Sequence, residues 1–275
     1  MPFSSEQAAR DLLAFYAEAG VDALVGEVPV DRFAVSEPAP ASLPTGPAST
    51  PVGEPRRPMA APVVRSSTPV VAPDEAAMTA RTAARSASTL AELRAILDRF
   101  DGCALKTTAK QLVFGDGNPQ ARVMFVGEAP GRDEDIEGRP FVGRSGKLLD
   151  RMIKAIGLER ADTYITNIIP WRPPGNRDPS PQESMFCLPF IQRHIELVNP
   201  DVLVCLGKPS SQTLLNIKDG ILKSRGRWYP YALPARQIRA MVTLHPAYLL
   251  RQPNQKRLAW RDFLAIQKEL AATPQ

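Results

Sequence analysis

The sequence predicts an α/β fold, a three-layer α/β/α arrangement around a central four-stranded parallel sheet. Three observations lead to this prediction. Four short apolar runs are typical of buried strands. Amphipathic segments of helical period lie between these runs. Strands and helices therefore alternate along the chain, and strand–helix–strand crossovers make neighbouring strands parallel and cover both faces of the sheet.

The predicted elements follow one another from about residue 89 to residue 271. Strands are predicted over 122–126, 163–169, 201–206 and 241–244. Helices are predicted over 89–100, 145–156, 180–198, 209–217 and 255–271. Apolar residues make up 44% of the 275 residues, which is enough for a packed core. Ligands of such sheets bind at the carboxyl ends of the strands, so functional residues are expected there.

The chain divides into three segments. Residues 1–37 are predicted to form an N-terminal helical segment, with an amphipathic helix over 5–25. Residues 38–86 are predicted to be a disordered Pro/Ala-rich linker, because ten prolines lie between residues 38 and 73 and few large apolar residues accompany them. Residues 87–275 are predicted to form the main folded domain. The N-terminal helix could dock on that domain or on a partner, or it could be a dispensable tail.

The net charge of +5 is unevenly distributed. Residues 1–86 contain 7 Lys and Arg against 10 Asp and Glu, whereas residues 87–275 contain 27 against 19. A basic folded half suits a polyanion such as nucleic acid, although many basic domains bind none. No apolar run is long enough to span a membrane, and the first residues do not resemble a secretion signal. We therefore expect a cytoplasmic protein without a membrane partner. We also expect a monomer.

Polar side chains follow three of the predicted strands. Glu128 comes directly after the first strand, Asn167 lies near the end of the second, and His245 follows the fourth. Because the carboxyl ends of parallel strands meet at one edge of a sheet, we expect a carboxylate, an amide and an imidazole to converge there.

These residue types fit hydrolysis of an N-glycosidic bond on a base that is flipped out of a nucleic acid. The Asn167 amide can read a base edge with one donor and one acceptor, and Phe141, which lies between glycines, offers a stacking surface. A carboxylate can orient water, and a histidine can bond an oxygen that becomes anionic as the base departs. Arginines in the same loops could hold phosphates: Arg139, Arg144, Arg172, Arg177 and Arg251.

Each residue also has an ordinary structural interpretation. Glu128 could be a solvated loop charge or a helix cap, and Asn167 could complete a turn. Phe141 could belong to the core, and His245 could be a structural loop histidine. A group of acidic residues is predicted to form a solvated loop, because arginines flank it: Asp133, Glu134, Asp135 and Glu137.

Five segments resemble the uracil-DNA glycosylase superfamily, and the bacterial and archaeal family 4 enzymes closely. They occur in the family's order and at its spacing between about Phe100 and Ala271. The segments are 113–119, 127–131, 138–146, 167–178 and 245–251. The resemblance implies the fold of that superfamily and the removal of uracil from DNA.

The resemblance also implies roles for individual residues. It places Glu128 against the uracil pocket and the hydrolytic water, beside Gly127 and Ala129. Phe141 would stack on the uracil, and Asn167 would read it. His245 would bond the uracil carbonyl oxygen. The DNA-binding residues would be Arg144, Ser145, Arg172, Leu249, Leu250 and Arg251, with Leu249 or Leu250 as the wedge that enters the duplex. The water could be handled by Glu128, by a carboxylate among Asp133–Asp135 or by the backbone near Ala129.

One departure from the family concerns its cofactor. The family typically carries a [4Fe–4S] cluster on four cysteines. The resemblance places these ligands at positions where this chain has Phe100, Cys103, Trp171 and Cys187. Two thiolates do not suffice for a cubane cluster, so we expect no cluster, no metal and no other cofactor, with aromatic packing in its place. The third cysteine, Cys205, lies in an apolar strand and is expected to be a buried small residue.

The expected reaction is monofunctional hydrolysis that leaves an abasic site in single- or double-stranded DNA. The loop 131–138 is short and contains no histidine, unlike that of a relative in the superfamily that stays covalently attached to the abasic site. Two alternatives remain open. One is a glycosylase for another deaminated base, and the other is a catalytically inactive DNA-binding module, against which the set of Glu128, Asn167 and His245 argues.

Overall fold

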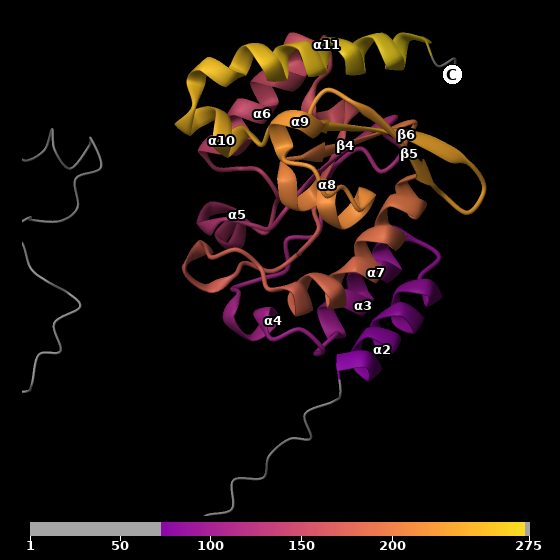
Figure 1. Ribbon diagram of the computed structural model, residues 1–275. Coiled ribbons are helices and arrows are strands. Elements are labelled where there is room, and N and C mark those ends of the chain that lie inside the picture. Colours follow the sequence, from indigo (N-terminus) through magenta and orange to yellow (C-terminus); the bar gives the residue numbers. More distant parts are fainter. Residues whose placement is uncertain (1–72, 273–275) are drawn as a thin grey trace, which may run out of the picture. The chain divides into compact units, whose positions relative to one another are not determined.

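The computed structural model describes residues 73–272, which fold as a three-layer α/β/α sandwich (Figure 1). A six-stranded sheet of order β1-β3-β2-β4-β6-β5 lies between two layers of helices. The strands are β1 (Asp116–Gly117), β2 (Val123–Gly127), β3 (Tyr164–Asn167), β4 (Val202–Leu206), β5 (Trp228–Ala232) and β6 (Gln237–Thr243). The predicted helix over 5–25 and the greater part of the predicted linker lie outside the described residues.

The four central strands β3, β2, β4 and β6 pair in parallel, which confirms the predicted four-stranded parallel sheet. The edge strands β1 and β5 pair antiparallel with their neighbours and were not predicted from the sequence. The first has only two residues. The second contains Pro230, which is unfavourable in a central strand but tolerated at the edge of a sheet because no further strand needs its missing N–H.

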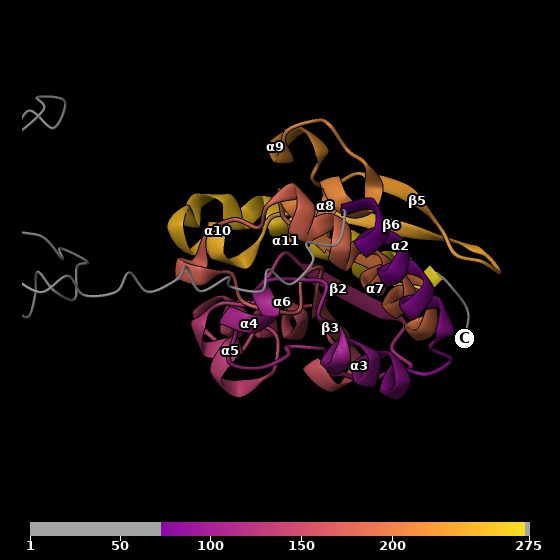
Figure 2. The same ribbon diagram turned by 90° about the horizontal axis from the view of Figure 1, so that it is seen from below.

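Helices cover both faces of the sheet (Figure 2). They are α2 (Pro73–Ser86), α3 (Leu90–Arg99), α4 (Leu105–Thr108), α5 (Arg132–Glu137), α6 (Arg144–Ala155), α7 (Pro181–Val198), α8 (Lys208–Leu215), α9 (Ile221–Ser224), α10 (Pro246–Arg251) and α11 (Lys256–Ala272). Short 3-10 helices are η1 (Arg160–Asp162), η2 (Pro174–Asn176) and η3 (Pro253–Gln255). The five predicted helices correspond to α3, α6, α7, α8 and α11. Within residues 73–272 no helix is long and apolar enough to cross a membrane.

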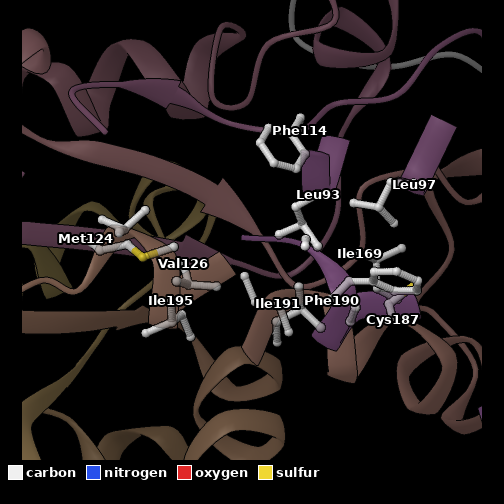
Figure 3. Close-up of a cluster of buried hydrophobic side chains, with 14 of the residues drawn as sticks. Leu93, Leu97, Phe114, Met124, Val126, Ile169, Cys187, Phe190, Ile191 and Ile195 are labelled. Carbon is white, nitrogen blue, oxygen red and sulfur yellow. The ribbon is translucent and has the colours of Figure 1, made fainter. Parts of the chain in front are cut away.

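Alternate residues of β2 face the two helical layers. Met124 and Val126 belong to a core cluster that includes side chains of α2, α3 and α7 (Figure 3). Val123 and Phe125 belong to a second cluster with side chains of α6 and α11. All five residues of β2 are buried, as the short apolar run predicts for a central strand that is covered on both faces.

The helix α2 corrects the predicted extent of the linker, which was expected to run to residue 86. This segment is an alanine-rich helix that packs on α7, and Ala80 and Ala84 are almost fully buried. Small side chains bury little area each, so the sequence pattern resembled that of a disordered segment. Their small size nevertheless lets two helices approach closely. Arg193 of α7 fixes the end of this segment by donating from Nε and Nη2 to the Ala87 carbonyl oxygen at 2.9 and 2.8 Å.

Enlarging Ala80 should destabilise the domain, because the closely packed α2–α7 contact has no room for additional methylene groups. We expect Ala80→Leu to lower the free energy of unfolding by about 1–3 kcal/mol, measured by urea denaturation. The matched control Thr82→Leu alters an exposed position of the same helix and should change the stability by less than about 0.5 kcal/mol. Equal stability of the two variants would contradict the docking of α2.

Candidate active site

A cavity of about 340 Å³ lies at the carboxyl ends of the parallel strands. Glu128 after β2, Asn167 at the end of β3 and His245 after β6 all line it, as the position of strand ends in a parallel sheet predicts. Phe141 forms another part of the wall, and its ring centroid lies 5.5 Å from that of His245. The structure therefore brings together the carboxylate, the amide, the imidazole and the aromatic ring that the sequence singled out. Ala129, Ser145 and Arg251 also line this cavity.

Gly127 allows two of these side chains to lie against the backbone. It pairs with Asn167 across the β2–β3 ladder. A β-carbon at Gly127 would contact the Asn167 amide oxygen and would lie 2.7 Å from Cζ of the Phe141 ring. Both distances are too short for a real side chain, so the amide and the ring occupy the space that any other residue at position 127 would fill.

The Asn167 amide is buried, and its oxygen lacks a hydrogen-bond partner in the part of the chain that the structure describes. The residue is 4% exposed, and its Oδ1 atom has no hydrogen-bond partner among the described residues. A buried acceptor without a partner costs about 1–3 kcal/mol, so such atoms are rare in folded proteins unless a ligand completes them. The amide thus has an acceptor free for a ligand that carries an N–H group.

His245 is held as a neutral hydrogen-bond donor. It caps the N-terminus of α10, where its Nδ1 accepts from the backbone N–H of Ala247 at 3.1 Å. Burial, aided by the positive charge of Arg251, lowers the pKa of His245 to about 4. At neutral pH the ring is therefore uncharged, and since Nδ1 accepts a proton, Nε2 carries the ring proton and can donate it as a hydrogen bond.

Glu128 is a carboxyl group of raised pKa. Burial, together with the negative charge of Asp178, raises its pKa to about 7. The sequence interpretation did not single out Asp178, although it lies in the segment 167–178 that carries the resemblance. Asn176, in the 3-10 helix η2, and Asp178, just after it, also line the cavity. Glu128 and Asp178 also line an adjoining cavity of about 330 Å³.

The acidic group at 133–137 is not the solvated loop that the sequence predicts, because it forms α5 and two of its carboxylates are buried. Glu134 is 7% exposed and accepts hydrogen bonds from the backbone N–H groups of Gly131, Val142 and Gly143. Asp135 is 2% exposed and accepts from the Lys110 N–H at 2.8 Å. Flanking arginines made the segment look solvated, whereas backbone amides of the neighbouring loops and of Lys110 are what the two carboxylates bind.

The residues that were predicted to bind DNA or hold phosphates differ in their exposure and in their ion pairs. Arg144, Ser145, Leu250 and Arg251 line a cavity of about 500 Å³ next to the first one. Arg144 and Arg251 are exposed, and neither has a carboxylate within ion-pair distance in the described part of the chain. Two other arginines are already paired, Arg139 with Glu137 and Arg177 with Glu183. Arg172 is only partly exposed and donates from Nε to Asn176 Oδ1 at 2.7 Å.

Leu249 does not have the exposure that a wedge requires. The segment after His245 is the helix α10, not a loop, and it turns Leu249 into a core cluster, where it is 1% exposed. Leu250, the next residue on the helix, is partly exposed and lines the cavity beside Arg251. Of the two leucines that the sequence left as alternatives, only Leu250 is partly exposed to solvent.

The residues at the family's cluster positions do not fit a four-ligand cluster. Phe100 and Trp171 are buried in the core cluster, and the Phe100 ring packs edge-on against Phe190 at 4.9 Å between centroids. Cys103 and Cys187 are buried free thiols that share a hydrogen bond, which lowers the pKa of Cys103 and raises that of Cys187. Across the described range, no three His, Cys, Asp or Glu side chains are grouped to hold a metal ion.

Comparison with known proteins connects this geometry with a family. A model of the uracil DNA glycosylase superfamily matches residues 114–264. The type-4 uracil-DNA glycosylase of Saccharolobus solfataricus is 42% identical over 177 residues, which cover 62% of this chain and 82% of that protein. The type-4 enzyme of Archaeoglobus fulgidus is 42% identical over 168 residues, or 60% and 84% of the two chains. That of Thermotoga maritima is 42% identical over 150 residues, or 54% and 77%. The chain belongs to the uracil-DNA glycosylase superfamily.

Proposed function

We propose that this protein is a uracil-DNA glycosylase, which hydrolyses the N-glycosidic bond of deoxyuridine in DNA, releases free uracil and leaves an abasic site. The relatives that it matches over most of their length carry this name. The observation that carries the proposal is the buried Asn167 amide. Its Oδ1 atom has no partner among the described residues, and Asn167 lines a cavity together with Phe141 and His245.

Recognition of uracil uses both ends of the Asn167 amide. Uracil presents an N–H donor at N3 and a carbonyl acceptor at O4. The Asn167 Oδ1 atom would accept from N3, and its NH₂ group would donate to O4. Cytosine carries the opposite pattern, an acceptor at N3 and an amino donor at C4, so it would leave the buried amide unpaired. Stacking on Phe141 would add affinity that is common to all bases.

Departure of the base is assisted by His245. Negative charge develops on the uracil carbonyl oxygen as the bond to the sugar breaks. The neutral ring, whose Nε2–H is fixed by the Ala247 contact at Nδ1, would donate to this oxygen. Because this donor is already oriented, the hydrogen bond costs little entropy in the transition state. The bond is stronger to the anionic oxygen than to that of the neutral base, so it stabilises the departing anion.

The attacking water is oriented by Glu128 in this proposal. Glu134 and Asp135 are engaged with backbone N–H groups, so they are less suited to the role. Glu128 lines the base cavity, and its raised pKa makes it a stronger base than an ordinary carboxylate. The same negative charge would stabilise the cationic sugar that forms as uracil leaves.

DNA would approach over Arg144, Ser145 and Arg251, at the N-terminus of α6 and on α10. Backbone N–H groups at a helix N-terminus and unpaired arginines both favour phosphate. Leu250 would fill the space that the flipped nucleotide leaves, and Arg172 would contact the strand beside it. We further propose that the protein acts as a cytoplasmic monomer on single- or double-stranded DNA, and that it does so without an iron–sulfur cluster.

The experiment that tests the function is release of free uracil from uracil-containing oligonucleotides under single-turnover conditions. His245→Ala should lower the rate constant by about 10²–10³-fold, because it removes an oriented donor to the leaving oxygen. DNA affinity, measured with the same duplex, should change far less. Equal losses of rate and affinity would indicate a structural histidine. Oligonucleotides with hypoxanthine or xanthine in place of uracil test the alternative specificity.

The pH dependence tests the role of Glu128. Because its pKa is raised to about 7, the carboxylate is lost as the pH falls through 7. The single-turnover rate should therefore rise through pH 7 and level off above it. Asp178→Asn removes a negative charge beside Glu128, so it should move this rise to lower pH, and Glu128→Gln should abolish it. A wild-type profile that is flat from about pH 5 to pH 9 would rule out ionisation of Glu128 as the controlling step.

Iron content tests the proposed loss of the cluster. The protein, purified anaerobically from iron-supplemented cells, should be colourless, lack stoichiometric iron and release uracil at full rate after treatment with a chelator. The double variant Phe100→Cys, Trp171→Cys restores four thiols and is the matched comparison for iron uptake. A brown wild-type protein with stoichiometric iron would contradict this part of the proposal.

A further inference from the structure

Phe141 has a backbone conformation that bulky residues rarely adopt. Its φ of 54° lies in the left-handed region, which disfavours residues with a β-carbon. The first turn of α6 packs directly against this backbone, because a β-carbon at Gly146 would overlap it, with the Phe141 Cα at 2.8 Å. Neighbouring groups must therefore hold the segment in place.

Two charged groups, one buried and one half-buried, bind the backbone of this segment. Oε1 of Glu134 accepts from the N–H groups of Val142 and Gly143, both at 3.0 Å. The Arg160 guanidinium donates from Nη2 to the Pro140 carbonyl oxygen at 2.6 Å and from Nη1 to that of Phe141 at 3.1 Å. The carbonyl groups before and at Phe141 and the amides after it are thus all fixed by side chains.

The same carboxylate also reaches the other wall of the cavity. Oε2 of Glu134 accepts from the Gly131 N–H at 3.1 Å, in the loop that carries Glu128 and Ala129. Glu134 itself lines the base cavity. One carboxylate therefore connects the loop of the water-orienting group with the loop of the stacking ring.

The guanidinium is fixed in turn by carboxylates from two other elements. Arg160 pairs through Nε with Asp116 of β1 at 2.7 Å and through Nη1 with Asp150 of α6 at 2.8 Å. These contacts orient the guanidinium plane toward the Pro140 and Phe141 carbonyl groups. The short edge strand β1 thereby contributes to the position of a ring in the cavity.

We propose that Glu134 and Arg160 are positioning residues for base recognition, which hold Phe141 in its left-handed conformation so that its ring forms a rigid stacking wall. This inference rests on the proposed function. Neither group needs to touch uracil. A rigid ring requires no rearrangement when the base enters, whereas a mobile ring would have to be ordered at each encounter.

The variants Glu134→Gln and Arg160→Lys test the proposal. Glutamine keeps the shape of the side chain but replaces one acceptor oxygen with an NH₂ group, and lysine removes the planar pair of donors. We expect each to lower the single-turnover rate of uracil release by about 10- to 100-fold and to weaken inhibition by free uracil to a similar degree. Affinity for uracil-free DNA should remain unchanged.

Arg193→Lys is the matched control. Arg193 also donates to a backbone carbonyl and also pairs with a carboxylate, Glu196, but it does so on α7, where it holds the end of the α2 segment. This variant should lower the unfolding temperature without changing inhibition by free uracil. A comparable loss of uracil inhibition in Arg193→Lys would show that general destabilisation explains the effects, and would overturn the proposal.

A double-mutant cycle with Phe141→Ala distinguishes positioning from an independent role. If Glu134 and Arg160 act through the ring, substituting either of them in the Phe141→Ala variant should lower the rate of uracil release little further. The proposal would be overturned if the rate loss of the double variant equalled, within about twofold, the product of the losses of the two single variants, because independent sites are additive in free energy. If the wild-type protein releases no uracil, the proposed function, on which this inference rests, is refuted. Measuring the wild type first therefore distinguishes failure of the proposed function from failure of this inference.

Discussion

The base cavity depends on how closely two side chains approach the backbone at the end of β2. Gly127 and Asn167 are paired in the parallel ladder, and the Phe141 ring lies against the same glycine. The register of β2 and β3 therefore fixes the amide, and the absence of a β-carbon at Gly127 allows the ring to lie beside it. The sheet thus sets the spacing between the amide that we propose reads a base and the ring that we propose stacks on it.

The loops then add the chemically reactive groups to this rigid edge. His245 begins α10 and is oriented by a backbone N–H of that helix. Glu128 is brought to a raised pKa by burial and by Asp178, from the loop after β3. That loop begins at the buried Trp171, which packs in the core cluster with Cys187 of α7. Packing of aromatic and apolar side chains, not metal ligation, is what we propose holds the start of this loop in place.

Much of the fold follows from the sequence, because four apolar strands and five amphipathic helices carry strong periodic patterns. The missed elements lack such patterns. α2 buries alanines, β1 has two residues, and β5 includes a proline. In the site, the convergence of Glu128, Asn167 and His245 follows from their places at strand ends. The burial of Leu249 does not, since it depends on packing with Leu148, which is far away in the sequence. The burial of Glu134 does not either, since it depends on how the loops on both sides of α5 direct their backbone N–H groups at its carboxylate.

The central claim is that the Asn167 amide reads uracil by its hydrogen-bonding pattern. Its most direct test compares Asn167→Asp with the wild type in single-turnover release of uracil and of cytosine from otherwise identical oligonucleotides. A carboxylate at this position accepts hydrogen bonds and offers no amide donor, so it should lose its match to uracil O4 and gain a match to the cytosine amino group. The account predicts slower uracil release and a reduced preference for uracil over cytosine. An unchanged preference in the variant would contradict it.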